Sequence, residues 1–185
     1  EDERQIIERI LAGSELAFRQ IVDQHSQRIF NYVRRMTRNS AEAEDISQET
    51  FIRFWVSRDR FDPGRVKLTT WLHRIAHNLC VDYFRQRQLQ ERPAPVQPDR
   101  QDSPDTEYEL SIRAGVVHKA LMSLSERQRS AIVLCHYQNF SQHDAAHILD
   151  LSVDALESLL RRGRRKLKQK LAKELEYHFT FQHSI

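Results

Sequence analysis

The chain has 185 residues, a net charge of +3 and only 4 glycines. This length fits one domain or two small ones, and few glycines among many charged residues favour helices over strands and turns. The longest apolar run, residues 131–135, is too short to span a membrane, and residues 1–4 lead into no hydrophobic signal segment. We therefore expect a cytoplasmic protein with no membrane insertion.

The first part of the sequence predicts four helices. Isoleucines at helical spacing form a short first helix, and Ser14 is placed to cap a second helix that runs to about Arg38. Ser40 is the expected cap of the third helix. After an Asp-Pro-Gly turn at residues 62–64, a fourth helix begins near Thr69.

A linker is expected in the middle of the chain. Four of the five prolines fall between residues 93 and 104, and residues 91–110 hold 6 acidic against 2 basic side chains. Such a composition buries too little apolar surface to offset the entropy lost on ordering. We predict a first domain over residues 1–88, a flexible acidic linker over 89–108 and a second domain over 109–185.

The second domain has the lengths of a helix-turn-helix. A capping box at residues 125–128 starts one helix. Residues 141–166 then give a helix of about eight residues, a three-residue turn and a longer helix capped by Ser152. Small residues, Ala145 and Ala146, stand where two helices must cross closely. The expected fold class is all-α, with an N-terminal helical bundle joined by the linker to a C-terminal helix-turn-helix.

The second domain is also basic. Residues 111–185 hold 12 Lys and Arg against 7 Asp and Glu, and most of these cations fall on the last helix. Arginine suits phosphates and guanine edges, because its guanidinium donates two parallel hydrogen bonds. This pattern predicts DNA binding in the major groove. A solvated cationic face on an ordinary helix pair is the alternative on charge alone.

Four segments resemble a known family in the same order along the chain. Residues 43–51 and 71–82 resemble the second conserved region of the extracytoplasmic-function (ECF) group of sigma-70-type sigma factors. Residues 11–18 look like the opening of that family, and residues 121–167 are similar to its fourth region. The resemblance implies a transcription initiation factor that directs core RNA polymerase to −35 and −10 promoter elements, for a stress or envelope response.

The third predicted helix carries an acidic face. Asp45, Gln48 and Glu49 share one side through i, i+3, i+4 spacing. Duplex DNA would repel such a face, so a protein partner is expected, and the resemblance implies docking on core RNA polymerase. The alternative is compensation of helix-terminal charge.

The resemblance also implies a site for the −10 element. Residues 58–67 look like the loop that receives a flipped-out base, and Phe61 could line its pocket by stacking. Trp71 is expected in the core rather than between bases. The side chains expected to face the promoter are Lys67, Arg74, Asn78, Arg85 and Arg87.

The predicted recognition helix departs from the family pattern. Ala155, Glu157 and Leu159 stand where the family commonly has Thr, Lys or Arg, and Arg. Gly163 replaces a common Ala, which is expected to cost the helix up to ~1 kcal/mol. We therefore expect −35 binding without a transferable base code. The expected contact residues are Ser158, Arg161, Arg162 and Arg165.

Histidine and cysteine spacings allow a metal site. His73, His77 and Cys80 fall at i, i+4, i+7, and His143 and His147 form another i, i+4 pair. Two or three ligands do not close a structural zinc site, so we expect no metal and no cofactor, and imidazoles that are exposed or partly buried.

Two other functional classes are compatible with parts of the sequence. A stand-alone helix-turn-helix regulator would need no acidic docking helix. A metal-dependent nuclease would need a carboxylate cluster or a nucleophile–base pair, and no such motif is evident, so we expect no enzyme. The resemblance further implies an anti-sigma factor wedged between the two domains. We expect the free chain to sample open arrangements from which that partner selects a compact one.

Overall fold

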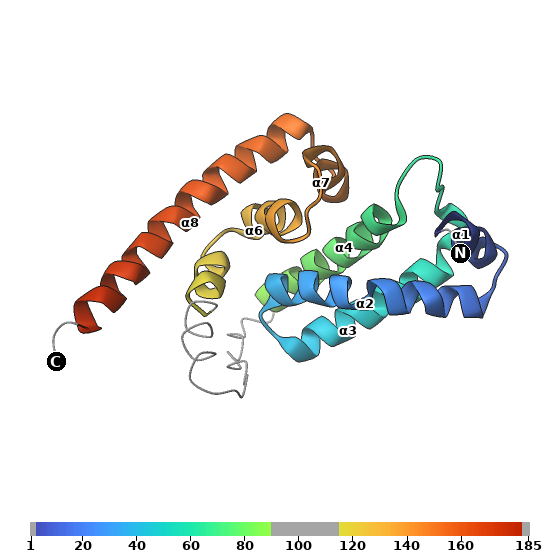
Figure 1. Ribbon diagram of the computed structural model, residues 1–185, viewed down its shortest axis with the longest axis horizontal. Helices are drawn as coiled ribbons and strands as arrows, with labels where there is room; N and C mark the ends of the chain where they lie inside the picture. Colours follow the sequence, from blue (N-terminus) through green and yellow to red (C-terminus); the bar gives the residue numbers. More distant parts are fainter. Residues whose placement is uncertain (1–2, 90–114, 183–185) are drawn as a thin grey trace.

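The computed structural model describes residues 3–89 and 115–182, with side chains up to residue 173. These residues form helices and no strands, which confirms the all-α prediction (Figure 1). None of the helices in these two ranges is long and apolar enough to cross a membrane. The N-terminal unit comprises α1 (Glu3–Leu11), α2 (Glu15–Thr37), α3 (Ser40–Val56), the short 3-10 helix η1 (Arg58–Arg60) and α4 (Leu68–Leu89).

Side-chain caps set two of these helix boundaries. Ser14 caps α2 as expected, because its side chain accepts a hydrogen bond from the Ala17 backbone N–H at 3.3 Å. The cap of α3 is Asn39 rather than Ser40. Arg38 ends α2 in the left-handed conformation, and the Asn39 amide oxygen then accepts from the backbone N–H of Ala41 at 3.0 Å. Ser40 is consequently the first residue inside the helix.

The N-terminal unit packs α2, α3 and α4 around one apolar core, with α1 against α2. Its largest fully buried side chains include Ile21, Tyr32, Phe54 and Leu72. Each of these residues lies on the inward stripe of its own helix, so burial removes a continuous apolar surface from water. The core thereby fixes which face of α3 and of α4 remains outside.

The C-terminal unit begins with a helix over residues 115–122 and continues with α6 (Glu126–Ile132), the π-helical turn η2 (Val133–Tyr137), α7 (Gln142–Leu149) and α8 (Val153–Gln182). The capping box is formed, with Ser125 and Gln128 bonding to each other's backbone N–H groups. The eight-residue α7 and the three residues before α8 confirm the predicted helix-turn-helix lengths.

Gly163 has a packing role that the sequence analysis did not anticipate. It is buried where α8 crosses α6, and a Cβ placed there would lie 3.2 Å from Ile132 Cγ1 and 3.6 Å from the Gln128 carbonyl oxygen. The missing side chain therefore permits close approach of the two helices. From the sequence, Gly163 was expected only to weaken the helix. The structure shows that it also lets α8 pack closely on α6.

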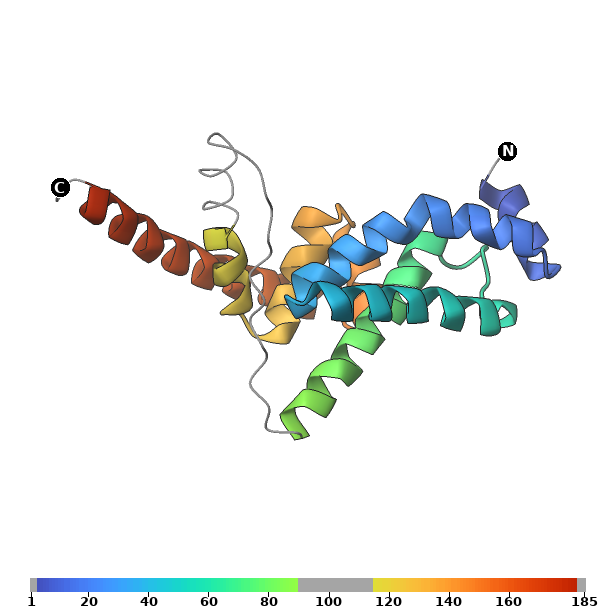
Figure 2. The same cartoon turned by 90° about the horizontal axis from the view of Figure 1, so that it is seen from below.

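The two units are packed against each other rather than separated. α7 lies against α4, η2 lies against α2, and buried residues of both units form one connected cluster. Figures 1 and 2 show α8 extending away from the N-terminal unit. The structure is thus a closed arrangement, and the sampling of open arrangements by the free chain stays a prediction. Residue 89 of the predicted linker is the last residue of α4, and the rest of the linker lies outside the described residues.

Candidate nucleic-acid and protein interfaces

The acidic face predicted on the third helix is formed and faces solvent. Asp45 and Gln48 are exposed, whereas Glu49 is partly covered by an ion pair with Arg53 at 2.7 Å. On the opposite side of α3, the Thr50 hydroxyl donates to the Ile46 carbonyl at 2.7 Å and is fully buried. The core thus turns the acidic side chains outward, where a protein surface could reach them.

This acidic face continues into exposed apolar side chains. Ile52 and Val56 are 56% and 72% exposed, and they follow Asp45 and Glu49 at helical spacing along α3. Leu16, at the start of α2, is 68% exposed. Only the polar residues of this surface were predicted from the sequence. The i, i+4 spacing of Ile52 and Val56 along the line of Gln48 was the signal that could have found the apolar part.

The loop before α4 is built differently from the prediction. Phe61 is only 4% exposed, with its ring centroid 6.0 Å from Phe54 and 5.8 Å from Trp71. Its ring is therefore part of the core and does not line an open pocket, which corrects the role predicted for that side chain. The loop itself turns on Asp62, whose Oδ1 accepts from the Gly64 backbone N–H at 2.9 Å.

Four of the residues predicted to face the promoter share one side of α4 and the residue before it. Lys67, Asn78 and Arg85 are exposed, and Arg74 is partly exposed. Arg85 also bonds to Asp82 at 2.7 Å within the same helix. Spacings of seven, four and seven residues place the four side chains in one row along the helix. The row could contact a nucleic-acid backbone along about 18 residues of helix.

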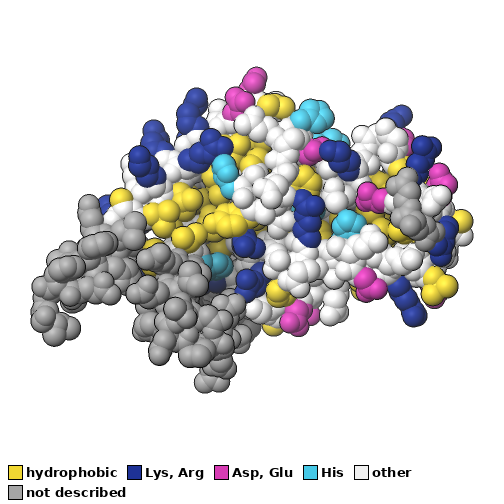
Figure 3. Space-filling view, viewed as in Figure 1, with side chains coloured by type: hydrophobic (Ala, Val, Ile, Leu, Met, Phe, Trp, Pro, Cys, Tyr) yellow, Lys and Arg dark blue, Asp and Glu magenta, His cyan; other side chains and the backbone are white. Residues whose placement is uncertain are grey.

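The predicted recognition helix presents its cations to solvent. Ser152 caps it by accepting from the Ala155 backbone N–H at 3.2 Å. Arg161, Arg162 and Arg165 are exposed and Ser158 is partly exposed, all on one face of α8. Figure 3 shows Lys and Arg side chains gathered over α8. These groups are available to phosphates and base edges.

Of the two histidines of α4, His73 is buried, which corrects the prediction for that residue, whereas His77 is partly buried as predicted. His73 is 1% exposed and its Nδ1 donates to the Thr69 carbonyl at 2.7 Å, while His77 Nδ1 lies 3.1 Å from the Tyr32 hydroxyl. Burial lowers the pKa of each imidazole to about 4 and raises the pKa of the Cys80 thiol to about 12. Among the described residues, no three metal-ligating side chains gather into one site.

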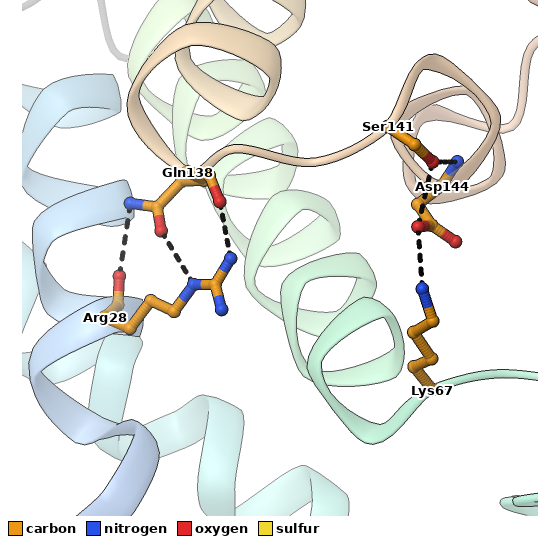
Figure 4. Close-up of polar contacts among 5 residues, drawn as sticks. All are labelled: Arg28, Lys67, Gln138, Ser141 and Asp144. Atoms are coloured by element: carbon orange, nitrogen blue, oxygen red, sulfur yellow. Dashed lines mark hydrogen bonds and ion pairs between the residues drawn. The ribbon is translucent and has the colours of Figure 1, made fainter.

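Side chains far apart in the sequence join the two units. Arg28 on α2 bonds to Gln138, and Lys67 Nζ lies 3.3 Å from Asp144 Oδ2 on α7 (Figure 4). Lys67 was predicted from the sequence as a site residue, whereas Asp144, Arg28 and Gln138 were not. No local pattern connects residues 77 or 110 positions apart, so only the tertiary structure brings them together.

Comparison with known proteins identifies both units. Residues 21–90 match the model of sigma-70 region 2, and residues 114–167 match the model of sigma-70 region 4. In this chain, region 2 is the helical bundle with the acidic face, and region 4 is the basic helix-turn-helix. The chain is therefore a sigma-70-type sigma factor, a class of transcription initiation factors.

Relatives in curated collections place the chain within that class. It is 32% identical over 178 residues to ECF RNA polymerase sigma factor SigW of Bacillus subtilis, covering 89% of this chain and 94% of the relative. It is 33% identical over 159 residues to ECF sigma factor SigE of Mycolicibacterium smegmatis, covering 83% of this chain and 61% of that longer relative. The chain belongs to the ECF group of sigma factors.

Two solved structures share the arrangement. CnrH in complex with the cytosolic domain of CnrY superposes with a TM-score of 0.72 at 27% identity, covering 92% of this chain and 97% of CnrH. Sigma factor RpoE in complex with the anti-sigma factor NepR, from Bartonella quintana, gives 0.67 at 26% identity, covering 84% of this chain and 96% of RpoE. The similarity therefore extends over both units.

Proposed function

We propose that this sigma factor binds core RNA polymerase through the exposed face of α3 and holds promoter DNA with the cationic faces of α4 and α8. The observation that carries this proposal is the separation of charge over the surface. Acidic and amide groups at Asp45, Gln48 and Glu49 occupy one helix, whereas cations occupy two others. Phosphates repel an acidic face, so this face is suited to a protein partner rather than to DNA.

The two cationic faces have different roles in this proposal. Arg161, Arg162 and Arg165 on α8 contact the −35 element as duplex in the major groove, with Ser158 beside them. The row from Lys67 to Arg85 holds the −10 strand after opening, and Asn78 is the side chain in that row that reads a base edge through its amide. Arginine contacts to phosphate position the DNA, while the amide supplies sequence discrimination.

An anti-sigma factor is the proposed regulator. The similarity to RpoE of Bartonella quintana, solved together with its anti-sigma factor NepR, supports this assignment. The exposed apolar side chains of α3, Ile52 and Val56, give a protein partner surface to bury. A chain that works only as a stand-alone regulator would co-purify with neither core polymerase nor such a partner.

Run-off transcription with core RNA polymerase tests the proposal. Charge reversal at Asp45→Lys with Glu49→Lys should abolish core binding and promoter-directed transcripts while leaving DNA binding by the free chain intact or stronger. Asp23→Lys, a single charge reversal at an exposed position of α2, is the control to compare with each of Asp45→Lys and Glu49→Lys alone, and it should transcribe normally. Unchanged association of the double variant with core polymerase would contradict this docking role and favour a stand-alone, operator-binding regulator.

A further inference from the structure

The first two turns of α8 carry carboxylates on the same side as the arginines assigned above to duplex DNA. Asp154 and Glu157 are exposed, and Arg161 follows Glu157 by about one helical turn. We propose that Glu157 reads a cytosine base in the major groove, so that this carboxylate sets part of the sequence that the helix-turn-helix selects. The inference rests on the duplex-binding role proposed for α8 and names the base that one of its side chains recognises.

Glu157 lies near the N-terminal end of α8, the second helix of the helix-turn-helix. α8 begins at Val153, and Leu156 and Leu160 are buried against the rest of the C-terminal unit. Their burial leaves the side of the helix with Glu157 and Arg161 in solvent. In a helix-turn-helix the N-terminal residues of the second helix contact base edges, so a side chain in the second turn is within reach of a base.

The Glu157 carboxylate is left without a cation from its own chain. Glu49 and Arg53 of α3, four residues apart, form an ion pair at 2.7 Å. Glu157 and Arg161 have the same spacing, but within the described residues no cation pairs with Glu157. The carboxylate therefore stays available to a hydrogen-bond donor from outside the chain.

Arginines near Glu157 on α8 are held by other acceptors. Arg164 Nε donates to His136 Nε2 of η2 at 3.0 Å, and Arg162 Nε donates to the Ser158 backbone carbonyl at 3.1 Å. Each guanidinium keeps further N–H donors for phosphates. Because these bonds orient the cations before DNA is bound, the arginines can hold the phosphates while Glu157 lies beside the base edges.

The major-groove edge of cytosine is the one that suits a carboxylate. An ionised carboxylate only accepts hydrogen bonds, and cytosine presents its N4 amino donor in this groove. Guanine presents two acceptors and thymine presents one, so both repel the carboxylate, whereas adenine places the N7 acceptor beside its N6 donor. Burying a carboxylate against an acceptor is costly, so Glu157 selects by rejecting the wrong pairs as well as by binding the right one.

Compensation of the helix dipole accounts for Asp154 but not for Glu157. Asp154 lies in the first turn of α8, beside the backbone N–H groups that Ser152 caps. The influence of the dipole falls off within that turn, and Glu157 lies in the next one. Asp154 is therefore a charge-matched control for Glu157 on the same helix.

Selection from a pool of duplexes tests the inference on the full chain. The wild-type chain, mixed with 30-bp duplexes whose central ten pairs are random, should enrich C·G at one position. Replacing that pair should weaken binding at least about fivefold in fluorescence anisotropy. Glu157→Gln keeps the side-chain shape but places a donor beside the acceptor, which matches N6 and N7 of adenine. This variant should change the enriched pair at that position to A·T and leave the other positions unchanged.

The control variant separates base reading from charge. Asp154→Asn removes the same charge and should enrich the wild-type sequence. A wild-type sequence without the C·G pair, the same sequence for wild type and Glu157→Gln, or the same change for Asp154→Asn would overturn the role of Glu157 while leaving duplex binding by α8 in place. A wild-type chain that enriches no sequence would overturn the duplex-binding role of α8 as well, so the two failures are distinguishable.

Discussion

The helices α4 and α8 both carry a row of cations, but the two rows differ in what lies opposite them. On α4, Lys67 and Arg74 face carboxylates of the other unit. On α8, Arg161 and Arg165 face solvent. Charge patterning therefore predicts that both helices bind polyanions, but it does not show which of their cations are paired with carboxylates of the other unit. Accessibility depends on what the rest of the chain places opposite each row.

The units also differ in where their aromatic side chains lie. Both tryptophans, Trp55 and Trp71, belong to the N-terminal unit. Trp55 packs on Phe18 at 4.9 Å and Trp71 on Phe61 at 5.8 Å between ring centroids. Their fluorescence therefore reports the N-terminal unit alone, and this allows the coupling between the units to be measured.

The largest expected effect comes from emptying the core beneath α8. Leu160→Ala removes a side chain that is 2% exposed and should lower the free energy of unfolding of the C-terminal unit by about 2–5 kcal/mol. If the units stabilise each other in the closed arrangement, the tryptophan fluorescence midpoint in urea also falls, by less than the circular dichroism midpoint. A fluorescence transition identical to wild type would show that the units unfold independently.

Removing cations sharpens the contrast between the two rows. Arg161→Ala with Arg165→Ala should weaken binding of the free chain to a 30-bp duplex at least about tenfold and lower the salt slope by about two. Lys67→Ala with Arg74→Ala should change that affinity by less than about twofold, because these cations are paired within the chain. Fluorescence anisotropy over a salt series measures both, and equal losses would contradict the difference in accessibility.

Acid should open the closed arrangement. The pKa of His73 and of His77 is lowered by burial from 6.5 to about 4, so the closed form binds fewer protons than a form in which they are solvated. The charges near them oppose protonation: Arg28 and His25 from α2, and Arg127 from α6. The stabilisation is complete above pH 6.5 and is lost as the pH drops toward 4, where the equilibrium constant for closure falls by up to roughly tenfold per pH unit for each histidine.

Small-angle scattering between pH 7.5 and pH 5 measures this opening. The radius of gyration should rise while far-ultraviolet circular dichroism, the control for the helices, stays constant. A radius that is constant across this range would show that the two imidazoles are buried by the N-terminal unit alone and not by the interface.

The smallest expected effect is at the crossing of α8 over α6. Gly163→Ala gains helix propensity of up to ~1 kcal/mol but brings a Cβ to 3.2 Å from the buried Ile132, so we expect a net destabilisation below about 1 kcal/mol. Gly115→Ala, where nothing lies within 4 Å, is the matched control and should stabilise the chain. Thermal melts compare the two variants, and equal stabilisation by both would contradict the packing role of Gly163.

Sequence-based reasoning succeeded where the cause is local. The length of α7, the three-residue turn before α8, the capping box at Ser125 and the outward face of α3 follow from periodicity and from side chains within four residues of each other. The predicted cap of α3, Ser40, is one residue too late. The cap is Asn39, because the left-handed conformation of Arg38 ends α2 and makes Asn39 the residue that precedes the next helix. The functional assignments of the residues on these faces remain predictions.

The sequence by itself therefore determined the helices, the caps at Ser14, Ser125 and Ser152 and the sign of charge on each exposed face, since each depends on near neighbours in the chain. Only the tertiary structure decided that Phe61 is a core residue, that His73 is buried, and that Gln138 closes on Arg28. These depend on contacts between segments brought together by burial of apolar surface, whose geometry no local pattern encodes.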